Sequence, residues 1–146
     1  NAWQIIQGLE TVGLRMKQHC SNAEKVVTFL ETQKKVKNVI YPTNHQGEIK
    51  ERALKYMKGG YGSLVGMDVG TKENGAKFIN NLKMLYHVAN IGDARSLAIH
   101  PATTTHSQLN DEELLAAGVT PGYVRLSIGI EHPDDIVADI KQALAA

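Results

Sequence analysis

Apolar residues recur in this sequence with two different periods, which predict helices and strands in alternation. From residue 1 onward they return every three or four positions, so a helix is expected at or near the start. Ser21 and Glu24 have the spacing of a capping box, which predicts that a second helix begins there. Further helices are predicted at residues 48–57, at residues 71–81, between Asn110 and Gly118, and from Pro133 onward.

Shorter apolar stretches, bounded by glycine, proline or polar residues, lie between the predicted helices and are typical of strands. They cover residues 39–41, 62–69, 84–89, 96–99 and 123–128. Four or five strands with helices between them indicate an α+β or α/β fold. We expect a mostly antiparallel sheet of about four strands with helices on one face, which leaves the other face for solvent or a partner domain.

Composition narrows the class of protein. The 146 residues suit a single domain, 1–146, and 42% hydrophobic with 21% charged residues are ordinary values for a folded protein. A net charge of +1 gives no reason to expect nucleic-acid or membrane binding. The single cysteine, Cys20, and the absence of a long apolar run indicate a cytoplasmic protein. Because Asn1 is not an initiator methionine and the first helix has no lead-in, we expect a piece of a longer protein.

The predicted strand at residues 123–128 carries the strongest candidate for a binding residue. Side chains alternate along a strand, so Val124 and Leu126 share the face that packs against the helices. Arg125 then points from the opposite face, where a guanidinium on a rigid strand suits binding of a carboxylate or phosphate. The alternative is a structural arginine that pairs with a nearby acid such as Glu131, and the pattern alone does not decide between the two.

Other polar residues give weaker signals. The segment HPATTTH, residues 100–106, follows a strand and could contact a ligand, but its hydroxyls could equally satisfy their own turn. Six histidines are scattered without the spacing of a metal site, so no metal is expected. Cys20 is expected to be a small, partly buried residue and not a nucleophile.

Three motifs give the sequence a resemblance to a known family. NIGDARSL begins at Asn90, HPATTTH covers residues 100–106, and VRLSIGIEH runs through Arg125. Together with the opening QGLETVGLRMKQHCSNA, they resemble the C-terminal part of the pyridoxal-phosphate-dependent enzymes of Cys/Met metabolism, and the likeness covers nearly the whole chain. The fold implied is the small C-terminal domain of fold type I, the aspartate-aminotransferase type.

The resemblance also implies roles at three positions. Arg125 matches the arginine that clamps the substrate α-carboxylate, in agreement with its place on the strand. Asn90 matches a position that contacts the same carboxylate near the cofactor lysine. Thr105 matches a threonine that supports this pocket, and the two histidines of HPATTTH are expected to be structural.

The resemblance implies that the catalytic centre is incomplete in this sequence. Residues 1–20 would be the leading helix that joins a large cofactor-binding domain, and residues 21–146 would form the small substrate-binding domain. The lysine that holds pyridoxal 5'-phosphate covalently would lie in the large domain, so no catalytic residue is expected here. Thr71-Lys72 only faintly resembles the lysine motif, and Lys72 is expected to lie on the surface.

Within the family, Asn90 and the NDEELLAAGVTP segment look most like the O-acetylhomoserine sulfhydrylases. The implied reaction replaces the γ-acetoxy group of O-acetyl-L-homoserine with sulfide or methanethiol, giving homocysteine or methionine and acetate. The alternatives are a methionine γ-lyase, a cystathionine γ-synthase, or a non-catalytic domain that binds an amino acid. The resemblance also implies that the parent is a homo-oligomer, a tetramer. The fragment alone is expected to be inactive.

Overall fold

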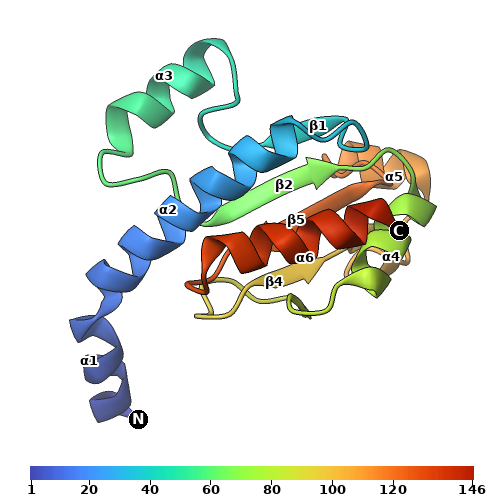
Figure 1. The fold of residues 1–146 in the computed structure, drawn as a ribbon. Helices are drawn as coiled ribbons and strands as arrows, with labels where there is room; N and C mark the ends of the chain where they lie inside the picture. Colours follow the sequence, from blue (N-terminus) through green and yellow to red (C-terminus); the bar gives the residue numbers. More distant parts are fainter.

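The computed structural model describes residues 1–146 and contains one five-stranded sheet with helices before, between and after its strands (Figure 1). The strands are β1 (Asn38–Ile40), β2 (Leu64–Asp68), β3 (Tyr86–His87), β4 (Leu97–Ile99) and β5 (Tyr123–Ser127). The helices are α1 (Ala2–Glu10), α2 (Val12–Glu31), α3 (Gly47–Tyr56), α4 (Lys72–Asn81), α5 (Asp111–Ala116) and α6 (Pro133–Ala145), and η1 (Pro101–Thr103) is a short 3-10 helix. Every predicted strand is present, in the predicted order.

The strands lie in the order β1-β2-β5-β4-β3, so β5 occupies the centre of the sheet. Three of the four neighbouring pairs are antiparallel, and β3 adds to β4 in parallel at one edge. The mostly antiparallel sheet is confirmed, with one strand more than the four expected. In the centre, Arg125 of β5 lies opposite Gly66 of β2 and Ile99 of β4.

One face of the sheet is covered by helices. Figure 1 shows α2 and α6 lying across the sheet, with α4 beside them. Side chains from these three helices and from β2 and β5 form one buried cluster, which includes Val26, Leu30, Phe78, Leu126 and Ile140. The prediction of helices on one face is confirmed for this layer, while α3 stands apart from it at the top of Figure 1.

The helix predicted to begin at Ser21 begins nine residues earlier, at Val12, and the prediction of a cap at Ser21 was wrong. Ser21 is an exposed residue in the middle of α2, because the buried face continues through it from His19 to Ala23. The chain breaks instead at Thr11, whose backbone leaves the helical region between α1 and α2. The boundary expected between residues 20 and 21 therefore falls inside a continuous helix.

The N-terminal helix α1 and the uncovered face of the sheet both leave apolar side chains exposed. No residue of α1 is buried, and Trp3, Ile6 and Leu9 are each more than half exposed. On the sheet and α3, Leu64 and Tyr56 are exposed as well. None of the helices combines the length and the apolar character needed to cross a membrane.

Candidate carboxylate-binding site

Arg125 lies on the uncovered face of the sheet, as the strand pattern predicted. Its neighbours Val124 and Leu126 are fully buried under the helices, whereas Arg125 is only partly buried. Because β5 pairs with a strand on each side, the backbone at Arg125 is fixed by the ladder of hydrogen bonds. The Arg125 side chain therefore projects from a strand whose backbone is paired on both sides.

No acidic side chain pairs with Arg125. The two ion pairs of the chain join Arg52 to Glu48 and His132 to Asp134. Glu131, the alternative partner considered from the sequence, accepts hydrogen bonds from Ser96 instead. The interpretation of Arg125 as a structural partner of Glu131 is therefore wrong, and the guanidinium remains available for an external anion.

The structure brings Asn90 and Arg125 together through the backbone. Arg125 Nη2 donates a hydrogen bond to the carbonyl oxygen of Asn90, at 3.3 Å. The Asn90 side-chain oxygen accepts from the backbone N–H of Ile91 at 2.9 Å, so the side-chain amide is oriented within its own turn. Arg125 and the exposed residue Asn90 thus lie close together through the Asn90 backbone, and the guanidinium is a donor suited to a carboxylate.

Thr105 lies apart from this pair. It is exposed in the loop after η1, and its hydroxyl contacts His106 Nδ1 at 2.9 Å. It forms no hydrogen bond with Arg125 or Asn90 within the chain. The loop does start beside the site, because Ile99 at the end of β4 is paired with Arg125.

A cavity of about 530 Å³ opens beside Arg125 on the uncovered face, between α3 and the sheet. Most of its lining is apolar and includes Ile49, Tyr56 and Leu64, while Tyr123 and Arg125 contribute from β5. Burial raises the pKa of Tyr123, although the charge of Arg125 acts in the opposite direction, so the phenol stays neutral at physiological pH. The cavity therefore combines an apolar wall with two arginines, Arg125 from β5 and Arg52 from α3, and Arg52 is paired with Glu48.

Gly66 opposite Arg125 is required by the shape of this face. A Cβ atom at position 66 would lie 2.7 Å from Cε2 of Tyr123 and 3.1 Å from Cβ of Ile40. A contact of 2.7 Å is shorter than real Cβ atoms show, so a larger residue at position 66 would force the Tyr123 ring to move. The missing side chain at position 66 thus shapes the floor of the cavity.

His100, the first residue of the loop 100–106, has a structural role. It is fully buried, and its Nε2 lies 2.8 Å from the carbonyl oxygen of Pro121, so Nε2 carries the proton that is donated. Its Nδ1 lies 2.9 Å from the hydroxyl of Thr103. Burial lowers the pKa of His100, so the ring is neutral at physiological pH. Gly75 of α4 packs directly on this ring, and a Cβ there would collide with it.

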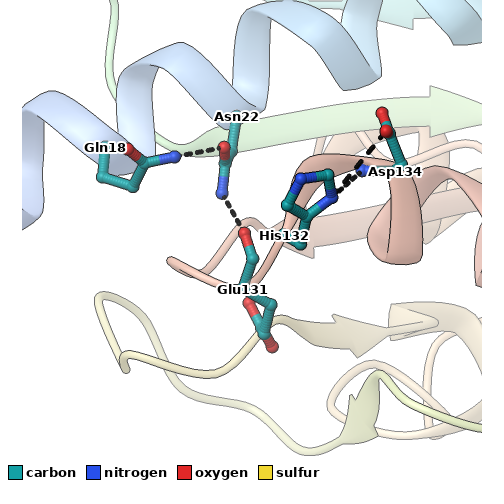
Figure 2. A network of polar contacts seen from close by, with 5 residues as sticks. All are labelled: Gln18, Asn22, Glu131, His132 and Asp134. Carbon is teal, nitrogen blue, oxygen red and sulfur yellow. Dashed lines mark hydrogen bonds and ion pairs between the residues drawn. The ribbon is translucent and has the colours of Figure 1, made fainter.

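A polar network that the sequence did not reveal holds the segment just after β5. Asn22 of α2 donates through Nδ2 to the carbonyl oxygens of Gly129, at 3.0 Å, and Glu131, at 2.8 Å. Figure 2 shows Asn22 reaching Glu131 from α2, with Gln18 bonded to Asn22 on the other side. The adjacent His132–Asp134 contact caps α6 on the surface. No periodic pattern in the sequence predicts this network, because Asn22 and its acceptors lie 107 and 109 residues apart.

The chain holds no group of three or more His, Cys, Asp or Glu side chains that could bind a metal ion. Cys20 is buried in α2 against Gly60. What the geometry offers is a guanidinium without an acidic partner, in the wall of a mostly apolar cavity.

The sheet has one face covered by helices, and Arg125 lies on the other face beside the cavity. The model of the Cys/Met metabolism PLP-dependent enzymes matches residues 1–145, and the chain belongs to this family.

Relatives and a solved structure support the family. An O-acetyl-L-homoserine sulfhydrylase of Leptospira meyeri is 50% identical over 99% of this chain and 33% of its own length. An L-methionine gamma-lyase of Fusobacterium nucleatum is 43% identical over 99% of this chain and 36% of its own. A crystal structure described as an O-acetylhomoserine (thiol)-lyase from Campylobacter jejuni covers 100% of this chain and 35% of its own, with a TM-score of 0.91 and 42% identity. The chain thus spans about a third of the length of these relatives.

The family is pyridoxal-phosphate-dependent, but the residues of this chain do not make a site for the whole cofactor. The Campylobacter structure carries its pyridoxyl-lysine at position 205, outside the part that matches this chain. The cavity beside Arg125 has no lysine in its lining, and Lys72 lies at the start of α4. The donors present here fit the carboxylate of an amino acid, and the cofactor lysine belongs to a segment outside this chain.

Proposed function

We propose that this chain is the substrate-carboxylate-binding domain of a PLP-dependent O-acetylhomoserine sulfhydrylase. The observation that carries the proposal is the guanidinium of Arg125, which has no acidic partner and lies on the uncovered sheet face beside Asn90 and a cavity. A carboxylate bound there receives charge-assisted hydrogen bonds from a rigid strand. Thr105 would support the pocket from the loop after η1.

The parent protein would replace the γ-acetoxy group of O-acetyl-L-homoserine with sulfide or methanethiol, forming homocysteine or methionine and acetate. The names of several relatives, including the one from Leptospira meyeri, support this reaction. When bound, pyridoxal phosphate withdraws electrons from the amino acid substrate. This domain would contribute position: with its carboxylate held by Arg125, the amino acid cannot rotate freely. Positioning of this kind can lower an activation barrier by several kcal/mol, and the largest reductions are about 7–11 kcal/mol.

The parent would also contain the large domain that this chain lacks. We propose that residues 1–20 join that domain and that residues 21–146 form the small domain. The exposed apolar side chains of α1 support this division, because exposed contiguous apolar surface usually marks an interface. A homo-oligomeric, cytoplasmic parent is part of the same proposal.

Substitution of Arg125 in the full-length protein tests the function. Arg125→Ala should lower kcat/KM for O-acetyl-L-homoserine about 30-fold or more, because loss of a buried charge-assisted contact costs roughly 2–5 kcal/mol. The absorbance of bound pyridoxal phosphate should stay unchanged. Lys141→Ala, which removes an exposed cation from α6, is the matched control. Wild-type kinetics for Arg125→Ala would refute the assignment.

The L-methionine gamma-lyase relative favours one second candidate, γ-elimination by the same fold. Product analysis of the full-length protein separates the two reactions. A sulfhydrylase supplied with O-acetyl-L-homoserine and sulfide gives homocysteine, whereas a lyase supplied with methionine releases methanethiol, a 2-oxo acid and ammonia. A non-catalytic amino-acid-binding domain would give neither product and no absorbance from bound cofactor.

A further inference from the structure

The loop between β3 and β4, residues 88–96, carries Asn90 and is held against β5 and the segment that follows it. The first attachment is the hydrogen bond from Arg125 to the carbonyl oxygen of Asn90. The second is the buried hydroxyl of Ser127, which accepts from the backbone N–H of Gly92 at 3.3 Å. The position of Asn90 relative to Arg125 therefore depends on how this loop is fixed.

The third attachment is the strongest and involves the carboxylate of Glu131. One of its oxygens accepts from the backbone N–H of Ser96 at 2.6 Å, and the other accepts from the Ser96 hydroxyl at 2.9 Å. Ser96 is fully buried, and its Oγ in turn accepts from the backbone N–H of Gly129 at 2.8 Å. Both carboxylate oxygens are thus used to hold one residue at the end of the loop.

Glu131 is itself held from the helical layer. Asn22 of α2 binds the carbonyl oxygens on both sides of position 130, as Figure 2 shows for Glu131. Gly129 completes the fit, because a Cβ at that position would collide with the Glu131 carboxylate and with the backbone of Ala94. A continuous set of contacts therefore runs from α2 through Glu131 and Ser96 to the loop that carries Asn90.

We propose that Glu131 is a positioning residue for the carboxylate site, which it serves by fixing residues 88–96 so that Asn90 faces Arg125. This inference rests on the proposed function of Arg125. Glu131 has no direct contact with Arg125, so it acts only through the loop. A misplacement of about 1 Å caused by a mutation away from the reacting atoms can cost about 100-fold in activity. The backbone N–H of Ile130 also donates a hydrogen bond to the carbonyl oxygen of Ala94 in this loop. The loop should therefore stay attached when Glu131 is removed, but its position should be less well defined.

The test measures how strongly the full-length protein distinguishes a ligand with a carboxylate from the same ligand without it. The probes are L-norleucine and n-pentylamine, which differ only in the carboxylate, and the readout is the ratio of their inhibition constants. Glu131→Ala should reduce this ratio about ten-fold, with bound pyridoxal phosphate and the inhibition constant of n-pentylamine unchanged. Glu131→Gln keeps a carbonyl acceptor for the Ser96 N–H and should restore most of the ratio.

Matched variants separate the possible failures. Asp134→Asn removes an exposed acid three positions away and should leave the ratio at the wild-type value. Arg125→Ala should bring the ratio of the two inhibition constants close to one, because the carboxylate is no longer recognised. If the ratio stays at the wild-type value, the proposed function fails. If Arg125→Ala brings the ratio close to one but Glu131→Ala leaves it at the wild-type value, only the positioning role is overturned. Where Glu131→Ala does not fold, Ser96→Ala is the second variant. It removes the bonds of the hydroxyl to Glu131 and Gly129 but keeps the bond from the Ser96 N–H to Glu131, so it should lower the ratio less. An unchanged ratio would overturn the role.

Discussion

Arg125 stands between two fully buried residues, Val124 and Leu126, yet its own side chain reaches the uncovered face of the sheet. This alternation follows from the period of a strand, so the face of Arg125 could be predicted from the sequence. That Arg125 has no acidic partner could not be predicted, because Glu131 lies beyond the end of β5 and its carboxylate is bound by Ser96. Periodicity assigns a side chain to a face but does not describe a loop.

Gly75 offers a test of packing at the residue scale. Its α-helix presses on the buried ring of His100, where a Cβ has no space. Gly75→Ala should therefore lower the free energy of unfolding of the 146-residue chain by about 1–3 kcal/mol, despite the better helix propensity of alanine. Urea unfolding measures the change. Gly8→Ala, in α1, where nothing lies within 4 Å, is the control, and an equal effect in both variants would argue against the contact.

At the scale of elements, a buried carboxylate ties α6 to the chain before β3. Asp139 accepts from the backbone N–H groups of Lys83, Met84 and Leu85, at 2.9, 2.9 and 3.0 Å. Burial acts to raise the pKa of Asp139, but these hydrogen bonds outweigh it and leave the pKa below its ordinary value. The folded protein therefore favours the ionised form.

The contribution of Asp139 should depend on pH. Because its pKa is lower in the folded protein, its stabilisation is complete above the ordinary pKa of about 3.9 and is lost as the pH falls through the folded value. Asp139→Asn should cost about 1–3 kcal/mol of unfolding free energy at pH 7 and less at pH 3. Urea unfolding at both pH values checks this. A difference that stays constant with pH would show that the charge is not involved.

Helix boundaries show what local signals can and cannot predict. Asn110 and Glu113 form the predicted capping box, with reciprocal bonds of 2.9 and 3.0 Å, and the cap of α4 at Thr71 is also present. The same type of motif at Ser21 failed, because the apolar stripe of α2 continues on both sides of it. A capping motif predicts a helix start only where the buried face also begins.

At the scale of the whole molecule, one face of the sheet is packed against helices, and the other face carries Arg125 and the cavity. The chain spans about a third of the length of its relatives, and it exposes apolar residues of α1 and a cavity beside Arg125. The fold class and the face of the site followed from the sequence pattern. The cavity did not, because it depends on where α3 stands relative to the sheet.

The 146-residue chain alone should be inactive. It contains no lysine beside Arg125, so purified chain mixed with pyridoxal phosphate should show only the absorbance of the free cofactor or of exposed lysines. It should release no acetate from O-acetyl-L-homoserine in the presence of sulfide. The full-length protein is the positive control. Turnover by the isolated chain at a rate comparable to the full-length protein would contradict the proposed division of roles.

The most direct measurement is a crystal structure of the full-length protein with L-norleucine bound. The account predicts that the ligand carboxylate lies within hydrogen-bond distance, about 2.7–2.9 Å, of the Arg125 guanidinium on the uncovered face of the sheet. A carboxylate bound by other residues, with Arg125 paired to an acid of the large domain, would contradict it.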